Sequence, residues 1–129
     1  MKTVTFQLKG QYIDQIKAGS KIEEYRSTSE YNTKRLCDQI DKKELHPGDH
    51  YLEGNKQIWR VKKDLTHVQF FNGYNKNRKE ILCELKGLDI IKYTNFLPEG
   101  MKPGTICFTL FLGKIVTSKN FPIEVGKHL

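Results

Sequence analysis

A cluster of charged residues early in the chain has residue types and a spacing that could do chemistry. The segment Gly19-Ser-Lys21-Ile-Glu-Glu24-Tyr-Arg26 fits the pattern G-x-K-x-x-E-x-R. Cationic side chains can hold an anion, and a glutamate can accept hydrogen bonds or move a proton. Side chains alternate along a strand, so that Ile22, Glu24 and Arg26 would share one face. We expect Ile22 to point into the core, Glu24 and Arg26 to lean toward a cleft on that side, and Lys21 to lie at its rim.

Two interpretations of this segment follow from the residue types. In the first, the charges form an ion pair within or across strands, which contributes about 0–1 kcal/mol to stability when exposed. In the second, Arg26 holds an anion in the cleft and Glu24 accepts hydrogen bonds, because a buried charge without a partner is costly. Residue types alone leave both interpretations open.

The net positive charge of the chain is concentrated in one window. Lys56 to Lys79 holds seven basic residues and one acidic residue, Asp64, and so accounts for six of the seven net positive charges. Aromatic residues are interleaved in this window, and Tyr74 follows the turn dipeptide Asn72-Gly73, which places it near a loop tip. Cations beside exposed rings suit nucleic acid, whereas a solvated basic face with its rings in the core is the alternative. The candidate nucleic-acid-binding residues here are Arg60, Lys62, Tyr74, Lys76, Arg78 and Lys79.

These residues must be positioned by a chain that is mostly strands. Apolar and polar residues alternate over residues 3–8, as in a strand, and residues 21–26 resemble a second strand. Between them, Tyr12, Ile13 and Ile16 have the spacing of one helix face, and Gly19 can end that helix. One or two helical turns are expected near residues 36–40. Further strand-like runs are 51–53, 57–62, 66–71, 80–91 and 106–116. This pattern predicts a β-rich α+β fold, a small closed or half-closed barrel formed as one domain over residues 1–129, with a bulge at Gly87.

Composition excludes several other classes of protein. The chain has 129 residues and no apolar run near the roughly 20 residues of a membrane span, so no membrane partner is expected. Its three cysteines lie far apart without a C-x-x-C pair, which indicates reduced core thiols in a cytoplasmic protein. His46 and His50 flank Pro47-Gly48, which argues against a helix presenting both to a metal. We expect no structural metal and no cofactor.

The motif, at a helix-to-strand junction in a small basic β-rich chain, resembles the ASCH domain family. Further segments resemble a branch of that family common in phage and bacterial genomes; they are Tyr31-Asn-Thr-Lys-Arg35-Leu36, Phe71-Asn72-Gly73-Tyr74 and Leu112-Gly113-Lys114-Ile115. The resemblance implies a small PUA-like β-barrel, with a helix between the first two strands and short additional helical turns.

The resemblance also implies a function, which is recognition of RNA or a nucleotide in a cleft between the barrel and the first helix. Carried over residue by residue, the motif marks Gly19, Lys21, Glu24 and Arg26. Gly19 shapes the junction, Lys21 and Arg26 supply positive charge, and Glu24 contacts a base edge or fixes Arg26. Arg60 and the loop from Tyr74 to Lys79 would extend the surface.

An enzyme is the alternative that the same family implies. Some small members remove an acyl group from a modified cytidine with the motif lysine, a nearby threonine and a more distant glutamate. Lys21 matches the lysine, but Glu24 stands where the threonine falls, and a carboxylate cannot replace a hydroxyl nucleophile without a change of mechanism. Thr28 is close to Glu24 in the sequence, but no pattern places it in the cleft. Lys21 and Glu24 as an acid/base pair of a nucleoside amidohydrolase or ribonuclease remain open. An unrelated partner-binding role is the third possibility.

Overall fold

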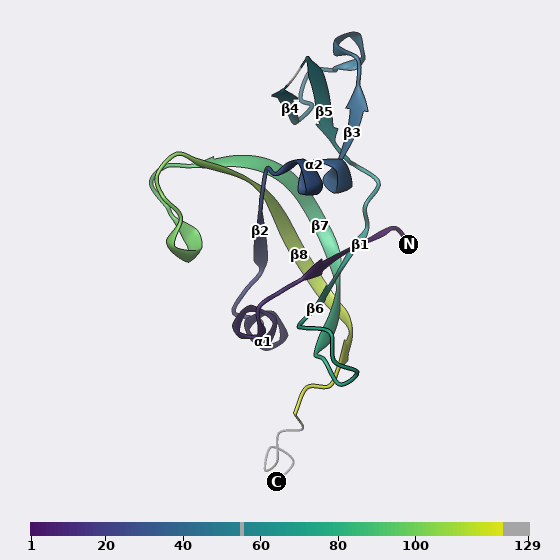
Figure 1. Cartoon of the computed structure of the whole chain (residues 1–129), viewed down its shortest axis with the longest axis vertical. Helices are drawn as coiled ribbons and strands as arrows, with labels where there is room; N and C mark the ends of the chain where they lie inside the picture. Colours follow the sequence, from purple (N-terminus) through teal and green to yellow (C-terminus); the bar gives the residue numbers. More distant parts are fainter. Residues whose placement is uncertain (55, 123–129) are drawn as a thin grey trace.

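The computed structural model describes residues 1–54 and 56–122, and these form eight strands and two α-helices (Figure 1). The strands are β1 (Thr3–Gln7), β2 (Glu23–Ser27), β3 (Cys37–Ile40), β4 (Tyr51–Gly54), β5 (Gln57–Val61), β6 (His67–Phe71), β7 (Glu80–Tyr93) and β8 (Thr105–Lys119). The helices are α1 (Gly10–Ala18) and α2 (Glu30–Leu36), with short 3₁₀ turns at Lys42–Glu44 and Pro98–Gly100. The expected β-rich α+β class is therefore confirmed.

The larger sheet is a curled half-barrel with strand order β1-β6-β7-β8-β2 (Figure 1). Strand β1 runs parallel to β6, and the other pairs are antiparallel. The outermost strands of this sheet, β1 and β2, are not paired with each other in the described residues, so the barrel is half-closed. A separate sheet of order β3-β5-β4 lies at one end of the molecule.

The long β7–β8 hairpin joins the two halves of the curled sheet. Strand β6 pairs with the first residues of β7, and β2 pairs with the first residues of β8, near the opposite end of the hairpin. Register shifts occur between Leu82 and Gly87, which confirms the irregularity predicted at Gly87. A side chain there would place its Cβ 3.3 Å from the Phe111 ring, so the bent hairpin favours glycine.

Helix α1 covers the inside of the half-barrel. Ile13 and Ile16 are buried in the same core cluster as the strand residues Phe70 and Phe108. Gly19 ends the helix with φ 85°, as its position predicted. None of the helices in the described residues is long and apolar enough to span a membrane.

Two further expectations have different outcomes. The helical turns expected near residues 36–40 lie earlier in the chain, in α2, which follows the Ser29 cap and ends at Leu36. The inclusion of Ile40 was wrong, because Ile40 lies in β3 and pairs with Ile58 of the small sheet.

The three cysteines are free and buried, as expected. Burial raises the pKa of the Cys37 thiol to about 12 and that of Cys83 to about 11.

We predict that Phe70→Ala lowers the free energy of unfolding by about 3–5 kcal/mol, because the Phe70 ring is fully buried and its removal leaves a cavity. Phe96→Ala is the matched control, since Phe96 is 72% exposed and its loss should change stability by less than about 0.5 kcal/mol. Urea unfolding followed by circular dichroism measures both. Equal effects of the two substitutions would contradict this description of the core.

Candidate functional site

The charged residues of the G-x-K-x-x-E-x-R segment meet in one buried network. Glu24 is only 2% exposed; one carboxylate oxygen lies 3.3 Å from Lys21 Nζ and the other 3.0 Å from Arg26 Nη2. The first oxygen also accepts the backbone N–H of Tyr25 at 2.9 Å. Lys21 forms a second ion pair with Glu99, from the loop between β7 and β8. The structure therefore brings together the three charged motif residues and adds a fourth charged group.

The expected orientation of two motif residues was wrong. Ile22 is 66% exposed instead of lying in the core, and Lys21 is 8% exposed instead of lying at a rim. The reason is that β2 begins at Glu23, so Lys21 and Ile22 precede the strand and its alternation does not apply to them. Lys21 turns inward because two carboxylates there compensate for the loss of hydration.

Aromatic rings enclose the Lys21 ammonium group. Its Nζ lies 5.0 Å from the ring centre of Tyr12 in α1 and 5.0 Å from that of Tyr25 in β2, which is within the range of cation–π attraction. The Tyr25 hydroxyl donates a hydrogen bond to Glu23 at 2.8 Å. Burial, followed by this hydrogen bond, raises the pKa of Tyr25, so its hydroxyl keeps its proton at neutral pH.

Glu99 is the site residue that the sequence analysis missed. It lies in the Pro98–Gly100 turn with φ 55° and ψ 32°, a left-handed conformation that costs a non-glycine residue about 1–2 kcal/mol. Glu99 is 78 residues from its partner Lys21 in the sequence, and the surrounding prolines and glycines indicated only a loop. The one available hint was the more distant glutamate of ASCH enzymes, which no sequence pattern placed in this chain.

One arginine side chain spans the gap between the outer strands β1 and β2, and a second arginine links α2 to β1. Arg26 Nη2 donates to the Gln7 carbonyl oxygen at 2.7 Å, and Arg35, from α2, donates to the Thr5 carbonyl oxygen. The two guanidinium groups pack against the Phe6 ring, with centroid distances of 4.6 Å for Arg26 and 4.5 Å for Arg35. Arg26 therefore has a structural role, and its buried Nε has no hydrogen-bond partner among the described residues.

An open cleft of about 500 Å³ lies beside this network. It is bounded by the end of β1, the start of α1, strand β2, the loop after β6 and the β7–β8 loop. The lining residues are Gln7, Leu8, Lys9, Tyr12, Glu24, Tyr25, Arg26, Asn72 and Glu99. The cleft lies next to the first helix, and it combines hydrogen-bond donors, carboxylate acceptors and aromatic rings.

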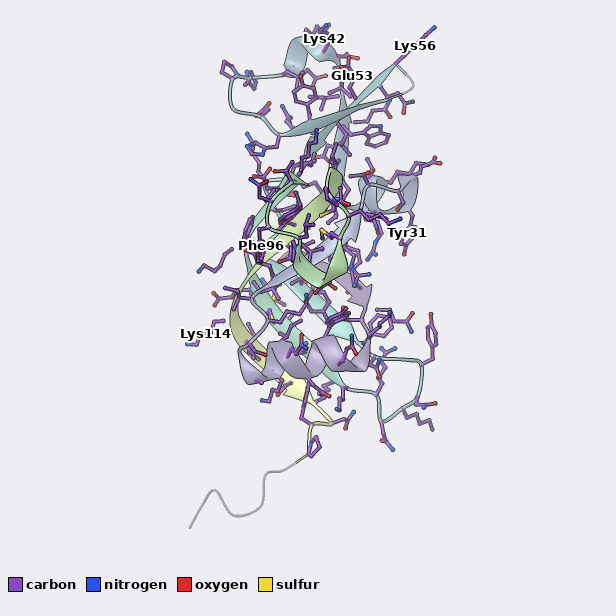
Figure 2. The ribbon with its side chains drawn as sticks, turned by 90° about the vertical axis from the view of Figure 1, so that its left-hand side faces the viewer. Tyr31, Lys42, Glu53, Lys56, Phe96 and Lys114 are labelled. Carbon is purple, nitrogen blue, oxygen red and sulfur yellow. The ribbon has the colours of Figure 1, made fainter. Side chains whose placement is uncertain are left out.

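The basic window does not form one surface around this cleft. Arg60 belongs to the small sheet and Lys62 follows it directly, whereas the loop from Tyr74 to Lys79 lies at the opposite end of the molecule (Figure 1). Lys56 extends from the small-sheet end (Figure 2). The small-sheet part of the window therefore does not extend the motif cleft.

Several of the candidate basic residues are held in ion pairs. Arg60 lies 3.4 Å from buried Asp49, Lys62 lies 4.0 Å from Asp38, Arg78 lies 2.8 Å from Glu80, and Lys79 lies 2.6 Å from Asp14. Asp49 has its pKa lowered, first by its hydrogen bond from Lys63 and then by the backbone N–H of His46. These contacts support the interpretation of much of this charge as structural.

Among the candidate nucleic-acid-binding residues of the window, Tyr74 is connected to the cleft through a residue of its lining, Gln7. It is 83% exposed, as its position after a turn predicted, and its hydroxyl donates to the Gln7 side chain at 3.1 Å. Its ring meets that of Phe71 edge to face, with a centroid distance of 6.3 Å. Tyr74 therefore borders the cleft and presents an aromatic surface there.

We predict that Arg26→Gln lowers the free energy of unfolding by about 2 kcal/mol, because it removes a charged hydrogen bond across the β1–β2 gap and one partner of buried Glu24. Lys34→Gln is the control. It breaks an exposed pair with Glu30, whose loss should cost less than about 0.5 kcal/mol. Chemical denaturation measures both variants, and an Arg26 variant as stable as the control would show that the gap does not depend on this side chain.

Comparison with known proteins assigns no family to the chain. No protein-family model, curated protein or solved structure matches it. The resemblance to ASCH domains therefore stays a prediction that rests on the sequence motifs, and the site has to be interpreted from its own geometry.

Proposed function

We propose that this protein binds RNA or a nucleotide in the cleft beside Lys21, Glu24 and Arg26, and that it is an ASCH domain with a PUA-like fold. The observation that carries this proposal is a network of four charged side chains, of which Glu24, Arg26 and Glu99 line one open cleft. The fourth, Lys21, is almost fully buried behind them and, like Glu24, is held by ion pairs. A fold gains little stability from buried ion pairs compared with apolar side chains of similar volume. Recognition of a polar ligand therefore explains this charged network better than a contribution to stability does.

The chemistry of the cleft suits a nucleobase. Lys21 and Arg26 are balanced by Glu24 and Glu99, so the network as a whole carries no excess charge. A nucleobase offers both donors and acceptors along its edges, and its faces can stack on aromatic rings. In this proposal the carboxylates accept from the base edge, and Tyr12 contributes an aromatic wall. A ligand oxygen that reaches Arg26 would accept a hydrogen bond from its guanidinium group, which lines the cleft.

The margin of the cleft suits the rest of a nucleotide or RNA chain. Lys9 lines the cleft and is exposed, and Lys76 lies in the same loop as Tyr74. In this proposal the lysines meet phosphate and the Tyr74 ring stacks on a neighbouring base, an interaction that contributes about 1–3 kcal/mol. Arg60 and Lys62 take no part, because they belong to the other end of the molecule.

Hydrolysis of RNA or a modified nucleoside is the second candidate, and one observation favours it. Lys21 lies between two carboxylates, and Glu99 is a distant glutamate of the kind found in acyl-removing ASCH enzymes. Against it, the residues that line the cleft, all in the described part of the chain, include no serine or threonine hydroxyl. Lys21 itself lines a neighbouring cavity with Ser20, whose hydroxyl donates to the Gln15 carbonyl oxygen. Thr28 lines a different cavity, beside α2 and the small sheet. Binding is therefore the function that we prefer.

We predict that Arg26→Lys weakens binding of a ten-nucleotide single-stranded RNA about tenfold, because lysine keeps the charge but lacks the planar guanidinium donors. Arg35→Lys is the matched control, since Arg35 also packs against the Phe6 ring but does not line the cleft. Fluorescence anisotropy at two salt concentrations measures both variants.

The same experiment has clear contrary results. Failure of the wild-type protein to bind RNA or mononucleotides at low salt, or an equal loss of binding in both variants, would refute a nucleic-acid site in the cleft. Turnover of an acylated nucleoside by the wild-type protein that disappears in Lys21→Met would favour the hydrolase instead.

A further inference from the structure

A second cavity of about 270 Å³ lies between the small-sheet end of the chain and the middle of β7. Its lining residues are Gly48, His50, Val61, Lys62, Lys63, Leu65, Leu85, Lys86, Gly87 and Leu88. It has no lining residue in common with the cleft at the motif. The proposed function leaves this cavity unexplained.

Apolar side chains form part of the lining. Val61 is buried, and Leu65, Leu85 and Leu88 are half-buried and pack against the main core. Leu85 and Leu88 are three residues apart, so a regular strand would turn them to opposite faces. The register shift between Leu85 and Gly87 breaks that alternation and allows both leucines to line one cavity. The irregularity in β7 therefore shapes the cavity.

The remaining lining side chains are basic. Lys62, Lys63 and Lys86 line the cavity together with His50, and none of the lining residues, all within the described part of the chain, is acidic. The cleft at the motif differs, because two carboxylates line it.

Neighbouring acids neutralise this charge in part. Lys63 is hydrogen-bonded to Asp49 at 2.9 Å, His50 pairs with Asp89, and Lys62 lies 4.0 Å from Asp38. Lys86 is exposed and takes part in none of the ion pairs found within residues 1–54 and 56–122. Lys86 is therefore the lysine best placed to meet an added anion.

We propose that this cavity binds a small amphipathic anion, in which a carboxylate or phosphate is attached to an apolar chain or ring. The anionic group meets the lysines, and the apolar part contacts Leu65, Leu85 and Leu88. Neither feature suffices alone, because a lysine cluster holds bare phosphate weakly in water and a small apolar surface holds a neutral molecule weakly. The site is independent of RNA binding at the motif.

Titration of the ¹⁵N-labelled full chain with octanoate and with phenyl phosphate tests this proposal and separates the two ligand sources. Saturable shifts of the amide signals of Lys62, Leu65, Gly87 and Leu88 are expected with at least one probe. Inorganic phosphate and hexan-1-ol, which each carry one of the two features, should bind at least tenfold more weakly. Lys86→Gln should weaken the preferred probe about tenfold. Lys114→Gln, at an exposed lysine outside the cavity (Figure 2), should leave its affinity unchanged.

Three results at the cavity itself would overturn the proposal. They are the absence of saturable shifts at the cavity with both probes, equal affinity for inorganic phosphate and the preferred probe, and equal losses in the Lys86 and Lys114 variants. Shifts confined to Leu8, Tyr12 and Arg26 would also overturn it, because they would place the anion in the other cleft.

Discussion

The structure depends on the buried charges that lie where the half-barrel is open. The outer strands β1 and β2 do not share a backbone ladder, and Arg26 connects them by donating to Gln7 while it pairs with Glu24. Glu24 in turn compensates Lys21, which also reaches Glu99 on a distant loop. Each buried charge needs the others, because removal of one partner leaves an uncompensated charge in a region of low dielectric constant. Fold and candidate site are thus built from the same contacts.

The long hairpin explains how these groups come together. Strands β7 and β8 carry β6 toward one end and β2 toward the other, and the irregular register between them lets the sheet curl. Curling brings β1 and β2 toward each other (Figure 1). Glu99, from the loop at the end of the hairpin, forms an ion pair with Lys21. The same irregularity shapes the second cavity, so one departure from regular pairing contributes to two candidate sites.

Local patterns in the sequence predicted much of this fold. The alternation of Val4, Phe6 and Leu8 gave β1, Gly19 marked the end of α1, and Gly87 marked the irregularity in β7. Ile22 was misplaced because β2 starts at Glu23, two residues later than expected, and alternation applies only within the strand. Local sequence patterns specify strand boundaries weakly, and a displacement of one residue moves a side chain to the opposite face of the sheet.

Long-range contacts lay beyond these patterns. The sequence grouped Lys21, Glu24 and Arg26 correctly, because they are close along the chain. It could not place Glu99, because that contact depends on a loop 78 residues away. It also treated the basic window as one surface, whereas the fold separates its two parts. Basic residues that are close in the sequence lie close together in the structure only when the chain that joins them does not cross the molecule.

The most direct measurement of the central claim is the NMR signal of the Arg26 Nε–H group during titration with a short single-stranded RNA. This group is buried and lacks a partner among the described residues. Binding in the cleft should shift its signal at saturation, together with the amide signals of Leu8, Tyr12 and Tyr25, which line the same cleft as Arg26. RNA that binds while these signals stay unchanged would show that the charged cleft is a structural device and that nucleic acid is held elsewhere.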